Sequence, residues 1–325
     1  MKAIVAARIG GPEVLELQDV PGPEPKANQI LVNVEACGVN FADIMMSQGS
    51  YAGGPKPPFV IGREFAGRIL ATGERVMGYT QGGAFAERIV TRRDFVWPVP
   101  DGWTVPEAAA FPVNYFTAFF AYWWAGLWSP DGTWQNRDKS GSVLVHAVAG
   151  GVGTAAVQIG KLLGLEMYGT SSSDEKLARA QRLGLQHPIN YKNVDYEEHI
   201  REVTNGEGVD AVFDMLGGDH TGKSMRCLKF RGHLIAYGSA TGVPHKFDIR
   251  ALYAKNCSVD GLWLSQLSLH PEYMKPAWEQ LSAWIAHGHL RPQIGHVMPL
   301  DKAADAFRLM LERKNYGKIV LKVSS

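Results

Sequence analysis

Cysteine is scarce in this sequence, whose 325 residues contain only Cys37, Cys227 and Cys257. An odd number of widely spaced cysteines argues against a disulfide framework and against a Cys-x-x-Cys zinc site. Unpaired thiols are typical of reducing compartments, so the sequence favours a cytoplasmic location.

An excess of one charge and long apolar runs are also lacking. Lys and Arg number 33 and Asp and Glu number 32, giving a net charge of +1, so no nucleic-acid partner is expected. No uninterrupted run approaches the ~18 apolar residues that indicate a membrane span. The most apolar window, residues 111–128, contains Pro112, Asn114 and Gly126, and we interpret it as a buried helix.

Two regions of different pattern make up the chain. In the first, Ile30, Val32 and Val34 alternate with polar residues between closely spaced Gly and Pro turns, which predicts a small barrel-like β domain. From Ser142 onwards, apolar runs alternate with helical patterns, which predicts a parallel, doubly wound sheet. The strands expected there are 143–145, 166–169, 209–213, 233–237 and 258–261. The helices expected are 106–125, 152–163, 174–183, 195–203, 221–228, 272–287 and 302–312. A last strand, 318–323, is predicted to pair with the first domain.

A glycine-rich loop, residues 147–153, follows the apolar strand and opens a helix. Glycines allow a tight turn and let a pyrophosphate approach the main chain, where the free N–H groups and the dipole of the helix bind the anion. The sequence therefore predicts a nucleotide site at Gly150, Gly151 and Gly153. The alternative is a plain tight turn.

The residues after the next strand indicate which nucleotide is bound. NAD sites place an acid at the end of this strand, but here Thr170 and Ser171 occupy that position and Lys176 follows. Small hydroxyl groups and a cation suit a 2′-phosphate, which favours NADPH. Asp174 and Glu175 count against this interpretation, although acids also favour the N-terminus of a helix. The alternative role for Lys176 is a solvated lysine in the first turn.

Further short motifs are spread over nearly the whole chain, at residues 35–43, 49–51, 58–67, 117–118, 189–191 and 317–321. With the glycine loop, they resemble the medium-chain dehydrogenase/reductase superfamily, in its zinc-free quinone oxidoreductase (zeta-crystallin-like) branch. The resemblance implies an α/β fold: a GroES-like β-barrel catalytic domain at 1–112 and 263–325, and a Rossmann NADP-binding domain at 113–262. It also implies a homodimer formed by edge strands around residues 257–261.

The same resemblance bears on zinc. Alcohol-dehydrogenase relatives supply a cysteine ligand near residue 40 and a histidine ligand near residue 63, where this chain has Asn40 and Arg63. Because neither thiolate nor imidazole is available there, no metal is expected. His146 is expected to be a structural residue at a strand end.

Resemblance further implies the cofactor contacts. Asn40 and Thr117 would face the nicotinamide. The remaining contacts group by the part of the cofactor they would hold: Ala149, Gly150, Gly151, Val152 and Gly153 for the pyrophosphate; Thr170, Ser171, Lys176 and Tyr191 for the 2′-phosphate; Gly238 and Ser239 for the ribose and nicotinamide.

A zinc-free site suits small, apolar substrates that are already electrophilic, so we expect reduction of quinones or α,β-unsaturated carbonyl compounds by hydride transfer. The Asn40 amide is a candidate donor to the enolate oxygen. Tyr51 is either a proton donor or an aromatic lid. Asp43 and Glu64 are expected to be structural, with Glu64 paired to Arg63 or another cation.

Two other functions remain open: an enoyl-thioester reductase, for which Arg92 and Arg93 would meet a carrier phosphate, and a non-catalytic NADPH-binding protein. The segment 67–76 is shorter than its counterpart in the family, and the segment 126–140 is longer. The resemblance therefore says less about the substrate than about the fold or the cofactor. Four aromatic residues either line an apolar pocket or pack in the core: Phe41, Trp123, Trp124 and Trp263.

Overall fold

The computed structural model describes residues 1–130 and 141–323. The chain forms two compact units: unit 1 is Met1–Asn114 with Arg291–Ser325, and unit 2 is Tyr115–Leu290. Most of the long loop expected at 126–140 lies outside the described residues.

The second boundary differs from the one expected at residue 263, because residues 263–290 belong to unit 2. The reason is aromatic packing within that unit. The Trp284 ring lies 5.9 Å from the ring of Phe119 and 5.6 Å from that of Trp128. Tyr273 similarly contacts Trp123 at 5.7 Å. These contacts, made by a helix distant in sequence, leave no local signal at residue 263.

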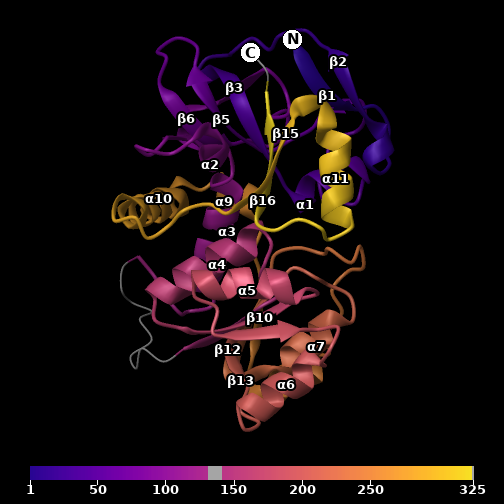
Figure 1. Ribbon diagram of the computed structural model, residues 1–325, viewed down its shortest axis with the longest axis vertical. Helices are drawn as coiled ribbons and strands as arrows, with labels where there is room; N and C mark the ends of the chain where they lie inside the picture. The colour runs from indigo at the N-terminus through magenta and orange to yellow at the C-terminus, as the bar shows by residue number, and fades with distance from the viewer. Residues whose placement is uncertain (131–140, 324–325) are drawn as a thin grey trace. The chain divides into compact units, whose positions relative to one another are not determined.

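Unit 1 is built mainly of antiparallel strands (Figure 1). Its strands are β1 (Lys2–Ala6), β2 (Leu15–Asp19), β3 (Gln29–Val39), β4 (Phe59–Val60), β5 (Glu64–Ile69), β6 (Arg75–Tyr79), β7 (Arg88–Arg92), β8 (Val96–Pro98), β15 (Ile294–Pro299) and β16 (Lys318–Lys322). Its helices are η1 (Pro12–Val14), α1 (Phe41–Ser47), η2 (Arg93–Phe95), α2 (Val105–Ala109), η3 (Leu300–Lys302) and α11 (Ala303–Leu311).

The C-terminal strand β16 lies inside the larger sheet of unit 1, whose order is β15-β16-β3-β5-β6-β8 with β7 also paired to β3. It runs antiparallel to β3, with Leu321 opposite Cys37. This confirms the predicted pairing of the terminal strand with the first β domain. Val32 and Val34 of β3 are buried on the core side of the sheet, as the alternating pattern predicted.

Unit 2 contains a six-stranded, fully parallel sheet of order β11-β10-β9-β12-β13-β14. The strands are β9 (Ser142–Val145), β10 (Glu166–Ser171), β11 (His187–Asn190), β12 (Val209–Asp214), β13 (Leu228–Ala236) and β14 (Ser258–Gly261). The helices are α4 (Gly151–Leu162), α5 (Asp174–Leu183), α6 (Tyr196–Val203), α7 (His220–Arg226), α8 (Ile249–Lys255), α9 (Leu264–Leu267) and α10 (Pro271–Ala286). The predicted doubly wound sheet is confirmed.

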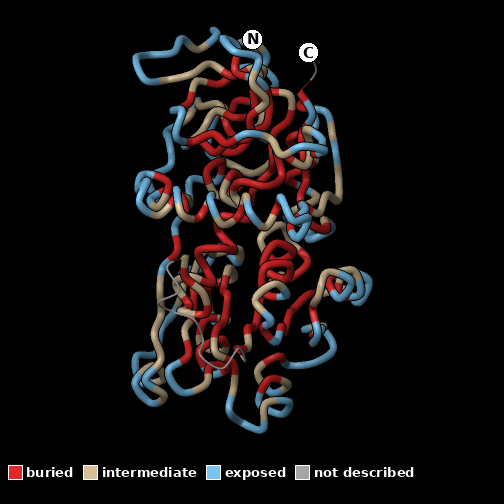
Figure 2. The backbone as a smooth tube through the Cα atoms, turned by 90° about the vertical axis from the view of Figure 1, so that its left-hand side faces the viewer, coloured by how far each residue is buried: buried red, intermediate tan, exposed pale blue. Residues whose placement is uncertain are grey.

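Burial in unit 2 explains why its strands have continuous apolar runs. Val143, Leu144 and Val145 are all fully buried, as expected for a central strand covered on both faces. Figure 2 shows buried backbone along the strands and exposed backbone on outer helical turns and loops. Three elements of unit 2 were not predicted: β11, α8 and α9. Each is short, and β11 contains Pro188.

The helix expected over 106–125 is two helices, α2 and α3 (Pro112–Trp124). Pro112 has no backbone N–H and therefore cannot continue α2. Most of the large aromatic side chains of α3 are buried, and these include Phe116, Phe119 and Phe120. None of the helices in residues 1–130 and 141–323 is long and apolar enough to cross a membrane.

Leu321→Ala tests whether β16 is part of the core of unit 1. Leu321 is fully buried, so we expect the free energy of unfolding to fall by about 2–5 kcal/mol. The control is Val297→Ala on β15, where the residue is 50% exposed. This variant should change the free energy of unfolding by about 0.5 kcal/mol or less. Urea unfolding followed by circular dichroism measures both, and equal losses would contradict a core position for Leu321.

Candidate nucleotide site and buried polar cluster

The glycine loop joins β9 to α4, with Gly150 as the N-terminal capping residue of α4. A Cβ atom on Gly153 would lie 2.5 Å from the carbonyl oxygens of both Ala147 and Val148, so the turn has no room for a side chain there. The N–H of Val148 donates to the carbonyl of Thr170 at 3.0 Å, which fixes the loop to β10. The N–H of Gly150 donates to the carbonyl of Ala147 at 2.8 Å. Since the first N–H groups of a helix have no partner within it, residues 151–153 fit a bound anion.

The end of β10 carries the residues predicted to surround a 2′-phosphate. Thr170 and Ser171 are buried, and the N–H of Tyr191 donates to the carbonyl of Ser171 at 3.1 Å. Lys176 lies in the first turn of α5, where partial burial lowers its pKa and repulsion from Arg179 acts in the same direction. Arg179 was not singled out in the sequence, although it follows Lys176 by three residues and therefore lies on the same face of α5.

The acids that counted against NADPH lie at the start of a helix, and Asp174 has a hydrogen-bond partner there. Asp174 and Glu175 lie in the first turn of α5, as their helix-terminus interpretation predicted. Asp174 Oδ1 accepts a hydrogen bond from Asn190 Nδ2 at 2.9 Å. Asp174 is thereby held by the neighbouring strand end.

Gly238 and Ser239 follow β13 in a turn in which the Ser239 hydroxyl donates to the carbonyl of Val243 at 2.7 Å. The carboxyl ends of adjacent parallel strands lie at the same edge of a sheet. Because β10, β9, β12 and β13 are consecutive neighbours, this turn, the glycine loop and the end of β10 belong to one edge of unit 2.

Thr117, which was expected to face the nicotinamide, is a buried residue of α3.

His146 directly follows β9 and is fully buried. Its Nδ1 and Nε2 atoms lie 3.0 Å from the hydroxyl oxygens of Thr170 and Ser224. Burial lowers the pKa of this imidazole. Both ring nitrogens hold neighbouring side chains, which confirms the structural role predicted for His146.

A buried polar cluster in unit 1 contains Asn40, Glu64 and Lys318. The ammonium of Lys318 forms an ion pair with Glu64 and donates to Asn40 Oδ1 at 2.6 Å. Asn40 Nδ2 donates to Glu64 Oε1 at 2.9 Å and to the carbonyl of Gly38 at 3.3 Å. The second carboxylate oxygen of Glu64 accepts from the N–H of Val113 at 2.8 Å. Glu64 therefore has a cation partner, as expected, and that partner is Lys318.

These contacts fix the orientation of the Asn40 amide. Rotating the amide by 180° would place its N–H groups against the ammonium and its oxygen against the carboxylate, which is repulsive on both sides. In the observed orientation both amide hydrogens are engaged, one by Glu64 and one by Gly38. The role predicted for Asn40 as a donor to a substrate oxygen would therefore require it to give up one of these hydrogen bonds.

Asp43 and Arg63 extend the cluster. Asp43 Oδ2 accepts from the N–H of Asn40 at 2.8 Å, while its buried Oδ1 has no hydrogen-bond partner among the described residues. Burial raises the pKa of Asp43 to about 7, although the Asn40 N–H and the charges of Arg63 and Lys318 oppose the shift. Arg63 is 3% exposed, and Tyr51 lies over its guanidinium at 4.8 Å.

The donor set of this cluster does not fit zinc. An amide held by an ammonium, together with a buried guanidinium, offers neither the soft thiolate nor the imidazole ligands of zinc sites in dehydrogenases. Throughout residues 1–130 and 141–323, no three His, Cys, Asp or Glu side chains come together to hold a metal ion.

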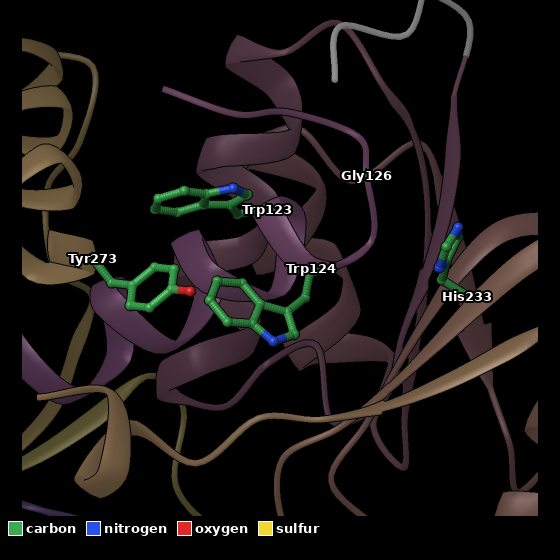
Figure 3. A pocket seen from close by; sticks show the side chains of 5 residues that line it. All are labelled: Trp123, Trp124, Gly126, His233 and Tyr273. Atoms are coloured by element: carbon green, nitrogen blue, oxygen red, sulfur yellow. The ribbon is translucent and has the colours of Figure 1, made fainter. Parts of the chain in front are cut away.

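A cavity of about 260 Å³ in unit 2 is lined by Trp123, Trp124, Gly126, His233 and Tyr273 (Figure 3). Its aromatic wall is continuous, because the rings of Trp124 and Tyr273 lie 5.5 Å apart. Trp123 and Trp124, which were expected either to line an apolar pocket or to pack in the core, therefore line this cavity.

Comparisons with known proteins agree with this architecture. Residues 26–101 match the family model "Alcohol dehydrogenase GroES-like domain", and residues 151–286 match "Zinc-binding dehydrogenase". The fold and the glycine loop define a medium-chain dehydrogenase/reductase. The chain belongs to the quinone oxidoreductase family within that superfamily.

Relatives and solved structures include both oxidoreductases and a vesicle protein. The human synaptic vesicle membrane protein VAT-1 homolog is 34% identical over 99% of this chain and 86% of that protein. Quinone oxidoreductase-like protein 2 homolog of Nematostella vectensis is 31% identical over 98% and 88%. The quinone oxidoreductase of Thermus thermophilus, solved also with NADPH, is 35% identical with a TM-score of 0.87 over 99% and 100%. That of Escherichia coli, complexed with NADPH, is 27% identical with a TM-score of 0.89 over 99% and 100%.

Gly153→Ala tests the glycine loop. The added methyl group would push the carbonyls of Ala147 and Val148 away, so we expect nucleotide affinity to fall at least about tenfold. Gly22→Ala, in the loop after β2 where a Cβ meets nothing within 4 Å, is the control and should bind normally. Isothermal titration calorimetry compares the two variants, and unchanged affinity in Gly153→Ala would refute the assignment of the loop.

Lys318→Met tests the buried ion pair. Removing the ammonium leaves the Glu64 carboxylate buried and unpaired, so we expect a loss of about 3–5 kcal/mol in the free energy of unfolding. The double variant Lys318→Met/Glu64→Gln removes both charges and should recover much of this loss. Urea unfolding gives the comparison, and equal losses in the single and double variants would show that the unpaired charge is not the cause.

Proposed function

We propose that the chain is a zinc-independent, NADPH-dependent reductase of quinones or α,β-unsaturated carbonyl compounds. The glycine loop at the N-terminus of α4 carries this proposal, because its turn has no room for a side chain at Gly153 and its free N–H groups suit a pyrophosphate. The quinone oxidoreductases of Thermus thermophilus and Escherichia coli have been crystallised with NADPH, which supports the same cofactor here.

The residues of unit 2 divide the binding of NADPH among them. Gly151, Val152 and Gly153 would hold the pyrophosphate through backbone N–H groups, with Gly150 forming the turn before them, and Gly238 and Ser239 would lie along the ribose. Ser171, Lys176 and Tyr191 would hold the 2′-phosphate, with Arg179 adding positive charge. When bound, the reduced cofactor supplies a hydride, that is, two electrons and a proton.

The buried cluster of unit 1 supports an electrophilic substrate. Without zinc, no Lewis acid polarises an alcohol or a simple carbonyl group at this position. A quinone or enone accepts hydride at carbon without such help, and its oxygen then carries negative charge until a proton from water neutralises it.

A second candidate is an enoyl-thioester reductase. A phenolphthiocerol/phthiocerol polyketide synthase protein of Mycobacterium tuberculosis is 33% identical over 99% of this chain, which covers 15% of that protein. The basic pair expected to meet a carrier phosphate has other partners. Arg92 is paired with Asp94, and Arg93 with Glu74 at 2.8 Å. Neutralised cations attract a phosphate weakly, so the carrier-bound thioester is the less favoured substrate.

We also propose that the chain forms a homodimer through β14, which is an edge strand of the sheet of unit 2. An edge strand presents unpaired backbone groups that a second copy can bind.

Oxidation of NADPH in the presence of 1,4-benzoquinone, a 2-alkenal or crotonyl-CoA tests the function. Turnover of the quinone or the alkenal supports the proposal. Turnover of crotonyl-CoA alone would favour the enoyl-thioester reductase, and tight NADPH binding without any turnover would refute an enzymatic role with these substrate classes.

Lys176→Ala tests the choice of nucleotide. Loss of a charged hydrogen bond to the 2′-phosphate should cost about 1.5–3 kcal/mol, or roughly a tenfold to hundredfold loss of NADPH affinity, with little change for NADH. Lys275→Ala, an exposed lysine on α10, is the control. Fluorescence titration with both nucleotides gives the ratio, and parallel losses for NADPH and NADH would contradict a 2′-phosphate contact.

A further inference from the structure

The cavity of unit 2 has an aromatic side made of three rings in mutual contact. The ring centres of Trp123 and Trp124 lie 5.7 Å apart, and the ring centre of Tyr273 lies 5.7 Å from the first and 5.5 Å from the second. Edge-to-face and tilted contacts of this kind hold aromatic rings in fixed positions. All three residues are only half-buried, so part of each ring surface remains to face the cavity.

His233 lines the cavity on the other side from these rings (Figure 3). It lies on β13, and its register partner on β14 is Ser258. Because side chains alternate along a strand, Asp260 projects from the same face of the sheet as Ser258. Leu234 belongs to the apolar core on the opposite face, and Val259 packs against that core. The three polar side chains therefore gather on the face of the sheet that carries the cavity.

Hydrogen bonds to Ser258 and Asp260 determine which nitrogen of His233 carries hydrogen. A carboxylate can only accept, so the single hydroxyl hydrogen of Ser258 is donated to Asp260 Oδ2 at 3.0 Å. The Ser258 oxygen must then accept from His233 Nδ1, which lies at 2.7 Å. Asp260 Oδ2 is itself 3.7 Å from Nδ1, and its negative charge favours a hydrogen there. In the neutral ring, Nε2 therefore has a lone pair and no hydrogen.

The Nε2 atom of His233 is the polar group that the cavity offers to a ligand. Its hydrogen-bond partner is not found among residues 1–130 and 141–323, where the ring is bonded only through Nδ1. Ligand sites combine apolar walls with a few polar groups that orient the ligand. An acceptor at Nε2 selects a ligand that has an O–H or N–H group.

The arrangement of the aromatic rings argues against a cation as this ligand. An aromatic cage holds an ammonium group over the faces of rings that surround it. Here the rings of Trp123, Trp124 and Tyr273 contact one another, so no ion fits between them. None of the five lining residues is an acid that would pair with a cation. The cavity therefore favours a neutral ligand.

The size of the cavity limits the ligand further. Its volume of about 260 Å³ exceeds the ~150 Å³ that holds benzene in an engineered apolar cavity. A compound of two fused rings is therefore a better match than one of a single ring. A flat ligand also suits the exposed ring surfaces of Trp123 and Trp124, because aromatic groups pack against each other favourably.

We propose that this cavity binds a neutral, planar, two-ring aromatic compound that carries one O–H or N–H group, as a naphthol or an indole does. The rings of the ligand pack against Trp123, Trp124 and Tyr273, and its O–H or N–H group donates to His233 Nε2.

This site is separate from the nucleotide site of the same unit. His233 is paired with Ser258, which is the first residue of β14. The turn at Gly238 and Ser239 instead follows the carboxyl end of β13, at the edge that carries the glycine loop. The inference therefore does not depend on the proposed reductase function.

Calorimetric titration with 2-naphthol and 2-methoxynaphthalene, in the presence of excess NADPH, tests the role of His233. The two probes share their rings, but only 2-naphthol has a hydrogen to donate. We expect the parent protein to bind 2-naphthol roughly fivefold or more tightly, and His233→Phe to lose this preference. His199→Phe, at a half-buried histidine of α6, is the control and should match the parent. Equal affinity of the parent for both probes would overturn the proposal.

Trp124→Leu tests the aromatic side and shows where the probes bind. Loss of the indole ring removes packing surface, so we expect both probes to bind roughly fivefold or more weakly. Unchanged affinity in this variant, or no binding of either probe by the parent, would contradict the proposed site. Phenyltrimethylammonium is the third probe, and tighter binding of it than of 2-naphthol would identify a cation site and overturn the proposal. Far-ultraviolet circular dichroism checks that each variant is folded, and Tyr273→Leu replaces Trp124→Leu if the latter is not.

Discussion

The buried ion pair between Lys318 and Glu64 is the constraint on which the cluster of unit 1 depends. It joins the last strand, β16, to β5 across the sheet, and the hydrogen bond from Lys318 to Asn40 spans 278 positions of sequence. Two charges taken out of water are tolerable only when each is paired and the remaining donors and acceptors are satisfied. Asn40 and the N–H of Val113 provide those contacts for Glu64. The same pair sets the orientation of the Asn40 amide.

The two units contribute different chemistry. In unit 2, four neighbouring parallel strands bring the glycine loop, Ser171 and the Gly238–Ser239 turn to one edge of the sheet, where backbone N–H groups and Lys176 suit a phosphorylated nucleotide. In unit 1, the clustered side chains are charged and buried, and they offer zinc neither a thiolate nor an imidazole ligand.

Much of the fold could be predicted because its signals are local. The alternation at Ile30, Val32 and Val34 indicated β3, and the glycine pattern after Val145 indicated the β9–α4 turn, both as observed. The pairing of the C-terminal strand followed from the rule that a strand needs a partner. The break at Pro112 was visible in the sequence, but the continuous aromatic pattern on either side of it was interpreted as one helix.

The candidate site was only partly predictable, since its decisive contacts link residues far apart in sequence. The pairing of Glu64 with Lys318 and the burial of Arg63 have no periodicity that a sequence could display. The engagement of both Asn40 amide hydrogens likewise depends on β5 and β3 lying side by side. Aromatic packing between α3 and α10 moved residues 263–290 into unit 2 for the same reason.

The most direct test of the account is the activity of metal-stripped protein with NADPH and a quinone, measured before and after addition of Zn²⁺. The account predicts the same kcat/KM in both conditions, because the buried cluster of unit 1 offers zinc neither a thiolate nor an imidazole ligand. Activity that is absent from the stripped protein and restored by Zn²⁺ would contradict it.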